Sequence, residues 1–249
     1  MNIPIIFEDS DLIVIDKPSG VIVNKAESVK TETVQEWIEK KFSIFLPRRQ
    51  AGNFQFSKNK ESEFYSRAGI VHRLDKETSG ILLIAKTPDA FENLQAQFKN
   101  REVTKKYITL AHGKLETSST IKASVGRLPW NRERFGVLAG GRDAETSYDV
   151  LKHYKSSLGE IFSLLDVTPL TGRTHQIRIH LKYAGHPVAC DPFYGGRKVY
   201  KRDLKFCPRL FLHAAYIKFK HPKTNSFMEF RSKLPQDLDE VLEKLASYV

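Results

Sequence analysis

Residues 70–87 read IVHRLDKETSGILLIAKT, and this stretch decides the fold. Residues 81–85 form a continuous apolar run between Gly80 and Pro88, a pattern that predicts a buried strand. The charged corner before the run carries one acid, Asp75, and loops held by rigid strands commonly carry catalytic side chains. From spacing alone, the simpler interpretation is that Asp75 caps backbone donors or pairs with a neighbouring cation.

Upstream of this stretch the sequence predicts a small set of strands and one helix. Short apolar runs around turn residues such as Pro-Ser-Gly predict strands at 5–7, 12–15 and 21–23. Apolar residues at helical spacing predict a helix of about eight to ten residues that begins near Thr33. Residues 47–67 are polar and lack periodicity, so we expect a long loop that leads into the charged corner.

Downstream, the sequence predicts further helices and strands. Pro88 and Asp89 mark the start of a helix that closes near residues 99–101. Residues 114–145 are rich in glycine and arginine and indicate a basic flap, without the lysine of a nucleotide-binding loop. The other predicted elements are strands at 103–110, 144–151 and 160–169, a hairpin of 215–220 with 227–230, and a helix from Pro235.

Residues 172–180, GRTHQIRIH, admit two geometries. In a strand, Arg178 would share a face with Gln176 and His180, whereas in a helix it would share one with Ile177. The approach to Gly185 is typical of a helix end, which favours the helix. Three histidines nearby have no acid or thiol that completes a zinc-like set, so we expect no metal at His175, His180 and His186.

Composition bounds the class of protein. Of 249 residues, 41% are hydrophobic and 28% charged, which is ordinary for a soluble protein of one domain or a closely joined pair. No apolar run approaches the roughly 18 residues that span a membrane, and the acidic N-terminus broken by Pro4 resembles no secretory or transit signal. Cys190 and Cys207 show neither disulfide nor metal spacing. We therefore expect a reduced, cytoplasmic protein that acts as a monomer.

The charge points to a polyanionic partner. The formal net charge is +11, and lysine and arginine release counterions when they neutralise phosphates. Basic residues gather in 40–49, 99–106, 127–142 and 197–209, interleaved with aromatic residues. Arginine together with aromatic rings suits RNA, because guanidinium groups grip phosphate while rings stack on unpaired bases.

Five blocks of the chain carry a family resemblance. The stretch HRLDKETSG with ILLIAKT closely resembles the catalytic motif of the RluA-type pseudouridine synthases. Four further blocks resemble the family's other motifs and occur in the family's order: DLIVIDKPSGVIV (11–23), REVTKKYITLAHG (101–113), LTGRTHQIRIHLKYAGHPVACDPFYG (170–195) and FLHAAYIKFKHPKT (211–224). Many relatives carry a small RNA-binding module before the first motif, and we expect that module to be missing here.

The resemblance implies a fold, a reaction and a partner. The fold is α+β, with a mixed, mostly antiparallel sheet in two halves, flanking helices and a catalytic cleft between the halves, formed by one catalytic domain over 1–249. The reaction breaks the bond from ribose to uracil nitrogen, turns the base and rejoins it through carbon, so no cofactor or metal is needed. The expected substrate is a tRNA or rRNA stem-loop rather than DNA, since base extrusion is least unfavourable in loops.

The resemblance also assigns site residues. Asp75 is the essential carboxylate, which adds to the sugar, attacks the uracil ring or assists proton loss from ribose; the sequence leaves these routes open. Arg178 pairs with Asp75 and keeps it ionised, and Tyr107 packs against the target base. The expected RNA contacts are Arg73, His72, Arg173 and His175, and residues 185–188 and 191–195 serve as scaffold for Arg178.

Two other classes compete with this interpretation. The first is a non-catalytic RNA-binding or ribosome-assembly factor on the same scaffold, which would have no chemical need for Asp75, Tyr107 and Arg178 together. The second is a carboxylate glycosidase, which needs a second carboxyl group for acid catalysis and gains nothing from a basic surface.

Overall fold

The computed structural model describes residues 1–42 and 60–248, and the chain folds into two compact units. Unit 1 comprises Met1–Val103 and Ile217–Ser232, and unit 2 comprises Thr104–Tyr216 and Lys233–Val249. Strand β10 (Leu212–Lys220) contributes to both units. The prediction of a single catalytic domain over the whole chain stays a prediction.

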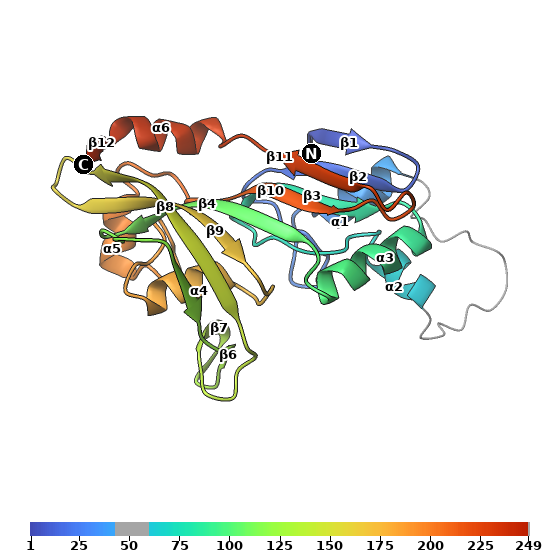
Figure 1. Ribbon diagram of the computed structural model, residues 1–249, viewed down its shortest axis with the longest axis horizontal. Helices are drawn as coiled ribbons and strands as arrows, with labels where there is room; N and C mark the ends of the chain where they lie inside the picture. The colour runs from blue at the N-terminus through green and yellow to red at the C-terminus, as the bar shows by residue number, and fades with distance from the viewer. Residues whose placement is uncertain (43–59, 249) are drawn as a thin grey trace. The chain divides into compact units, whose positions relative to one another are not determined.

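Unit 1 is built on a hydrogen-bonded strand order β1-β2-β3-β10, with β11 paired to β10 (Figure 1). Its strands are β1 (Ile5–Glu8), β2 (Leu12–Lys17), β3 (Ser79–Ala85) and β11 (Phe227–Arg231), and its helices are α1 (Val34–Lys41), α2 (Lys60–Ser66) and α3 (Pro88–Lys99). Strands β2 and β3 pair in antiparallel register, with Val14 opposite Leu83. Every residue of β3 is buried, which confirms the buried strand predicted at 81–85.

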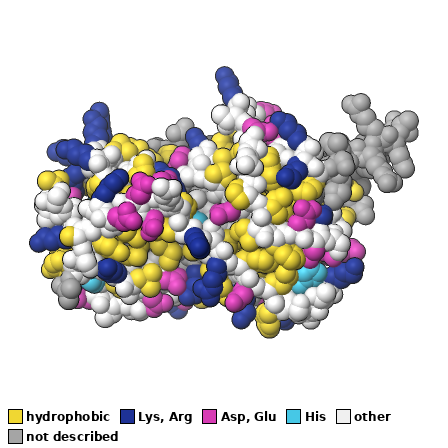
Figure 2. Space-filling model, turned by 90° about the horizontal axis from the view of Figure 1, so that it is seen from above, with side chains coloured by type: hydrophobic (Ala, Val, Ile, Leu, Met, Phe, Trp, Pro, Cys, Tyr) yellow, Lys and Arg dark blue, Asp and Glu magenta, His cyan; other side chains and the backbone are white. Residues whose placement is uncertain are grey.

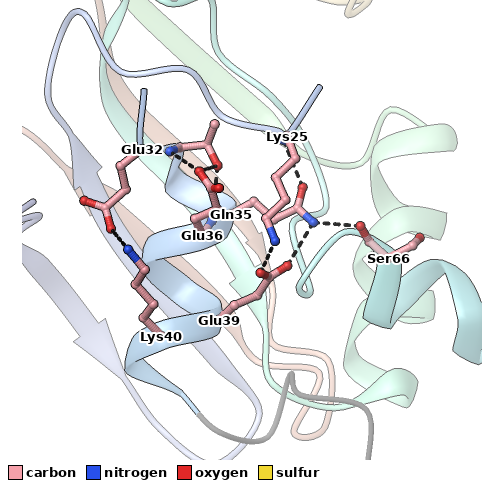
Figure 3. Close-up of polar contacts among 8 residues, drawn as sticks. Lys25, Glu32, Gln35, Glu36, Glu39, Lys40 and Ser66 are labelled. Atoms are coloured by element: carbon pink, nitrogen blue, oxygen red, sulfur yellow. Dashed lines mark hydrogen bonds and ion pairs between the residues drawn. The ribbon is translucent and has the colours of Figure 1, made fainter. Parts of the chain in front are cut away.

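Helix α1 is tied to its surroundings by the side chain of Gln35 (Figure 3). The Gln35 amide donates to the Ser66 carbonyl at 2.8 Å and to Glu39 at 3.1 Å, while its oxygen accepts from the backbone N–H of Lys25 at 3.1 Å. The carboxylate of Glu36 also closes a capping box at the start of the helix. These bonds fix α1 to α2 and to the segment before it, and they confirm the helix predicted from Thr33.

Two predictions in unit 1 were wrong. Residues 21–23 form no strand, because the carbonyls of Ile22 and Val23 accept from the first N–H groups of α1 instead. Residues 60–66 form helix α2 where a loop was predicted, because Phe64 packs edge-on against Phe91 of α3, with ring centroids 5.8 Å apart. The rest of the predicted loop, up to residue 59, lies outside the described residues.

Unit 2 has the strand order β10-β4-β9-β8-β12, with β5 paired to β8 and a separate two-stranded sheet of β6 and β7. Its strands are β4 (Thr104–His112), β5 (Ser119–Lys122), β6 (Val125–Leu128), β7 (Asn131–Val137), β8 (Glu145–Lys155), β9 (Ile161–Pro169) and β12 (Ala246–Tyr248). Its helices are α4 (Gln176–Tyr183), α5 (Arg197–Asp203) and α6 (Gln236–Lys244). The β6–β7 hairpin is drawn at the lower end of this unit in Figure 1.

The sheet of unit 2 is covered on both faces. Leu238 and Val241 of α6 belong to one apolar cluster with Leu110 and Phe162. On the opposite face, Ile177 and Leu181 of α4 pack with residues of β4 and β9 whose side chains point the other way, among them Ala111 and Leu165. The structure thus confirms the helix predicted around Arg178, and it shows that the segment 114–145, predicted as a basic flap, contains the strands β5, β6 and β7.

The prediction of an α+β fold with a mostly antiparallel sheet is confirmed. Every strand pair for which the register is described is antiparallel. Among the described residues, no helix combines the length and hydrophobicity that crossing a bilayer requires. Lysine and arginine side chains are interspersed with acidic and apolar ones on the face shown in Figure 2, so the positive charge is not gathered in one patch on that face.

Candidate active site

The turn that carries Asp75 opens directly into strand β3. The N–H of Thr78 donates to the carbonyl of Asp75 at 3.2 Å, which closes the turn, and the Asp75 side chain is half-buried. Since β3 is buried along its whole length, the acid sits at the end of a rigid element. The sequence prediction of an acid-bearing corner beside a core strand is confirmed.

Lys17, at the end of β2, holds the Asp75 turn in place through its buried ammonium group. Its side chain is fully buried, and its ammonium group donates to the carbonyls of Pro18 at 2.8 Å, Val21 at 2.9 Å and Lys76 at 3.1 Å. A buried charge is tolerated only when its donors are satisfied, and here backbone oxygens satisfy them. Two further bonds run from residues 19 and 20 to the backbone of residues 76 and 77. Lys17 therefore binds the turn before it to the Asp75 turn.

His72 and Arg73 lie on the approach to Asp75 and differ in exposure. The N–H of Leu83 donates to Nε2 of His72 at 3.0 Å, and the imidazole stacks on Phe98 with ring centroids 4.7 Å apart. The Nε2 atom is thus an acceptor inside unit 1. Arg73 is exposed. RNA contact by either residue stays a prediction.

Arg178 is buried on α4 and paired with Asp191. Its Nε donates to Oδ2 of Asp191 at 2.7 Å and its Nη2 to Oδ1 at 2.8 Å. The guanidinium also lies over the rings of Phe193 and Tyr194, 5.5 and 5.1 Å from their centroids. The backbone N–H groups of these two aromatic residues donate to Oδ1 of Asp191. The prediction that residues 191–195 serve as scaffold for Arg178 is confirmed.

The start of α4 is held by the side chain of Gln176, a role that no sequence pattern indicates. Its amide oxygen accepts from Thr171 at 2.6 Å and from the N–H of Arg173 at 3.0 Å, and its amide nitrogen donates to strand β8. His175 precedes it with a φ of 54°, in the left-handed region, and its Nδ1 lies 2.9 Å from the Tyr194 hydroxyl. The side chain of Arg173 donates to the carbonyl of Asp143 at 3.2 Å.

Tyr107 lies on β4 and packs against the same apolar cluster as Ile177 and Leu181 of α4. The structure therefore brings Tyr107 to the sheet face that α4 covers, and α4 carries Arg178. Lys105 precedes it by two residues on β4, so the two side chains share a face of the strand. Burial lowers the pKa of Lys105, a feature that the sequence prediction missed because it depends on tertiary packing.

The histidines 175, 180 and 186 each have their own partners and form no metal site within the described residues. One other group, Asp9, Asp11 and His221, has ligand atoms within 4.8 Å of one another. Nδ1 of His221 accepts from two backbone N–H groups, so its Nε2 carries the proton and donates to Asp9 at 2.9 Å. These bonds connect the turn at residues 221–224 to Asp9, so the group has a structural role.

The fold and these side chains define an α+β RNA-modifying enzyme of the pseudouridine synthase type. The sequence model described as "RNA pseudouridylate synthase" matches residues 11–183, and the chain belongs to this family. It is thus an RNA pseudouridine synthase, an isomerase that converts uridine in RNA. Family membership favours the enzyme over the binding-only factor and the glycosidase.

Relatives and a solved structure agree with this assignment. The chain is 36% identical over 246 residues to an uncharacterized RNA pseudouridine synthase of Bacillus subtilis, covering 98% of this chain and 73% of that protein. It is 36% identical over 244 residues to the ribosomal large subunit pseudouridine synthase D of Nitrosomonas europaea, covering 97% of this chain but only 64% of that protein. The structure of human RNA pseudouridylate synthase domain containing 1 superimposes with a TM-score of 0.73 at 25% identity, covering 99% of this chain and 89% of that one.

The predicted site residues divide between the units. Unit 1 contains His72, Arg73 and Asp75, and unit 2 contains Tyr107, Arg173, His175 and Arg178. Within unit 2 the structure joins Arg178 and His175 through the ring of Tyr194. The pairing of Arg178 with Asp75 stays a prediction.

Proposed function

We propose that the chain isomerises uridines in the unpaired loop of a ribosomal RNA stem-loop, with Asp75 as the catalytic carboxylate. The observation that carries the residue assignment is the Asp75 turn itself, closed by Thr78 and held by the buried ammonium of Lys17. The choice of ribosomal RNA over tRNA is supported by relatives named ribosomal large subunit pseudouridine synthase C or D, which are 32–36% identical to this chain.

Two further side chains complete the proposed chemistry. Arg178 supplies the cation that keeps Asp75 ionised, since a nearby positive charge favours the carboxylate form. Tyr107 stacks on the extruded uracil or takes a proton from the ribose. Arg73, His72, Arg173 and His175 contact the RNA around the target. The carboxylate then breaks and remakes the glycosidic linkage by one of the three routes that the sequence leaves open.

Replacing Asp75 by Asn tests this assignment. The variant should form no pseudouridine on ribosomal RNA, detected by carbodiimide labelling, and should keep its fold and its RNA affinity because the amide has the same shape. Glu77→Gln is the matched control, because Glu77 is an acid in the same turn and has no proposed role in the reaction. Turnover by Asp75→Asn at the wild-type rate would overturn the role of Asp75.

We also propose that the enzyme acts as a monomer in the cytoplasm. The proposal for the compartment is supported by the RNA substrate that the family name specifies. Sedimentation of the free protein and of its complex with a stem-loop RNA tests the oligomeric state; a dimer in both would contradict it.

A further inference from the structure

The β6–β7 hairpin presents a tryptophan to solvent. Strands β6 and β7 pair in antiparallel register, with Arg127 opposite Phe135, and Pro129 and Trp130 form the connection. The Trp130 side chain is 77% exposed, more than any other large hydrophobic side chain among the described residues. Tryptophan is enriched at interaction surfaces, because its large apolar ring also carries a polar N–H group.

The hairpin is anchored to unit 2. Val125 exchanges two backbone hydrogen bonds of 2.9 Å with Arg142 at its base, and it packs in one cluster with Ile179 of α4. Phe135 lies edge-on to His175 at the start of α4, with ring centroids 6.1 Å apart. Helix α4 also carries Arg178. The hairpin is therefore a preorganised arm attached to the helix of the proposed catalytic arginine.

The arm is strongly basic. Residues 122–142 contain one acid, Glu133, and five basic residues: Lys122, Arg127, Arg132, Arg134 and Arg142. Of these, Lys122, Arg127, Arg134 and Arg142 are exposed. The guanidinium of Arg127 lies 5.1 Å from the ring centroid of Phe135, so a cation and an aromatic ring are stacked on the flank of the arm. Positive charge with an exposed aromatic ring complements the phosphates and unpaired bases of single-stranded RNA.

We infer that the tip of the β6–β7 hairpin binds an unpaired nucleotide of the RNA substrate. Trp130 stacks on the base, and Arg127 and Arg134 contact the adjoining phosphates. The inference rests on the proposed function, since it concerns how the same RNA is held, and it adds a binding residue outside the proposed catalytic set. Stacking on an aromatic side chain is tolerant of sequence because every base offers a π-face. The arm therefore recognises unpaired structure rather than one base.

Binding of a single-stranded oligouridine of about 12 nucleotides, with duplex RNA of equal length as comparison, measures this contact. Trp130→Ala should weaken single-strand binding about 5- to 150-fold and leave duplex binding nearly unchanged. Trp130→Phe should restore most of the affinity. Leu158→Ala is the matched control, because Leu158 is 68% exposed in the same unit and lies in another connection, the one between β8 and β9. Both positions are exposed, so the three variants should fold normally.

The salt dependence of RNA affinity separates the phosphate contact of Arg127 from base stacking on Trp130. For Arg127→Ala the slope of log K against log salt concentration should fall by about 0.7, since one phosphate contact with a single strand is lost. For Trp130→Ala the slope should stay as in the wild type while the affinity drops. An unchanged affinity for Trp130→Ala would overturn the inference.

Tryptophan fluorescence gives a direct readout. The chain has two tryptophans, and Trp37 is only 8% exposed, so quenching by acrylamide reports mainly on Trp130. Bound oligouridine should quench the emission and protect it from acrylamide. If acrylamide still quenched Trp130 with RNA bound, the inference would be overturned, and a protein partner would be the alternative ligand of the hairpin tip. Pseudouridine formation is scored separately: its absence in the wild type would refute the proposed function, whereas intact turnover without protection of Trp130 would refute only this inference.

Discussion

Arg178 and Asp191 form a bidentate ion pair in the interior of unit 2, with nitrogen–oxygen distances of 2.7 and 2.8 Å and side-chain exposures of 2% and 0%. Paired N–H donors in a fork fix the plane of the guanidinium as well as its position. Asp191 in turn accepts from the backbone of Phe193 and Tyr194, which face the same guanidinium. The proposed catalytic arginine is therefore oriented within unit 2 by the carboxylate of Asp191.

Asp191→Ala should lower the free energy of unfolding by about 3–5 kcal/mol, because it removes the buried counter-charge of Arg178. Pseudouridine formation should fall more steeply than RNA affinity, since the guanidinium loses its fixed orientation. Urea unfolding and single-turnover kinetics measure the two effects.

The pair of Arg209 with Asp237 in the same unit provides the control for that prediction. It is also bidentate, but the Asp237 side chain is 44% exposed. Asp237→Ala should therefore change the unfolding free energy by at most about 1 kcal/mol. If the two variants lost equal stability, burial would not explain the strength of the Arg178–Asp191 pair.

Lys17→Met should destabilise unit 1 and slow turnover. The substitution keeps the length of the side chain up to Cε but removes the ammonium group from three carbonyl oxygens. The carbonyls of Pro18 and Val21 lose this donor, whereas that of Lys76, beside Asp75, keeps the bond from the Gly20 N–H. An unsatisfied buried acceptor costs about 1–3 kcal/mol, so a loss of at least about 2 kcal/mol is expected in urea unfolding. Lys76→Met, at an exposed side chain, should be neutral in the same measurement. Unchanged turnover in Lys17→Met would show that the Asp75 turn holds its geometry without this contact.

The difference between Asp75 and Lys17 shows what the sequence could predict. The corner that carries Asp75 could be predicted because its neighbours form a specific motif, and the helix at Arg178 could be predicted because the segment approaches Gly185 as helices do. Lys17 was missed because its partners are backbone carbonyls, which every residue has and no side-chain pattern reveals. Helix α5 was missed for a related reason: residues 197–203 are mostly basic and show no apolar stripe. Helix α2 was missed because it depends on the tertiary packing of Phe64 against Phe91 of α3.

Tyr107→Phe separates stacking from proton transfer. Phenylalanine keeps the ring and loses only the hydroxyl, so RNA affinity should persist while turnover falls if Tyr107 moves a proton. Tyr148→Phe is the matched control, because Tyr107 and Tyr148 both lie opposite Val167, on either side of strand β9, and pack against the same cluster. Full activity in both variants would restrict Tyr107 to stacking on the base.

His180 should make the stability of unit 2 depend on pH. Burial lowers the pKa of its imidazole below the ordinary 6.5, and a hydrogen bond to the Ala123 carbonyl opposes this only in part. Because Nε2 donates to that carbonyl at 3.0 Å, Nδ1 is the acceptor for the Thr146 hydroxyl at 2.9 Å, and protonation breaks this arrangement.

The sign of the His180 effect follows from proton binding. Below pH 6.5 the unfolded chain takes up a proton that the folded state binds only at lower pH, so stability is complete above about pH 6.5 and declines as the pH falls towards the folded pKa. Each unit of pKa difference corresponds to about 1.4 kcal/mol at most. Urea unfolding from about pH 8 to about pH 5 measures the decline, which His180→Asn should reduce and His153→Gln should leave in place. An undiminished decline in His180→Asn would assign the pH dependence to other groups.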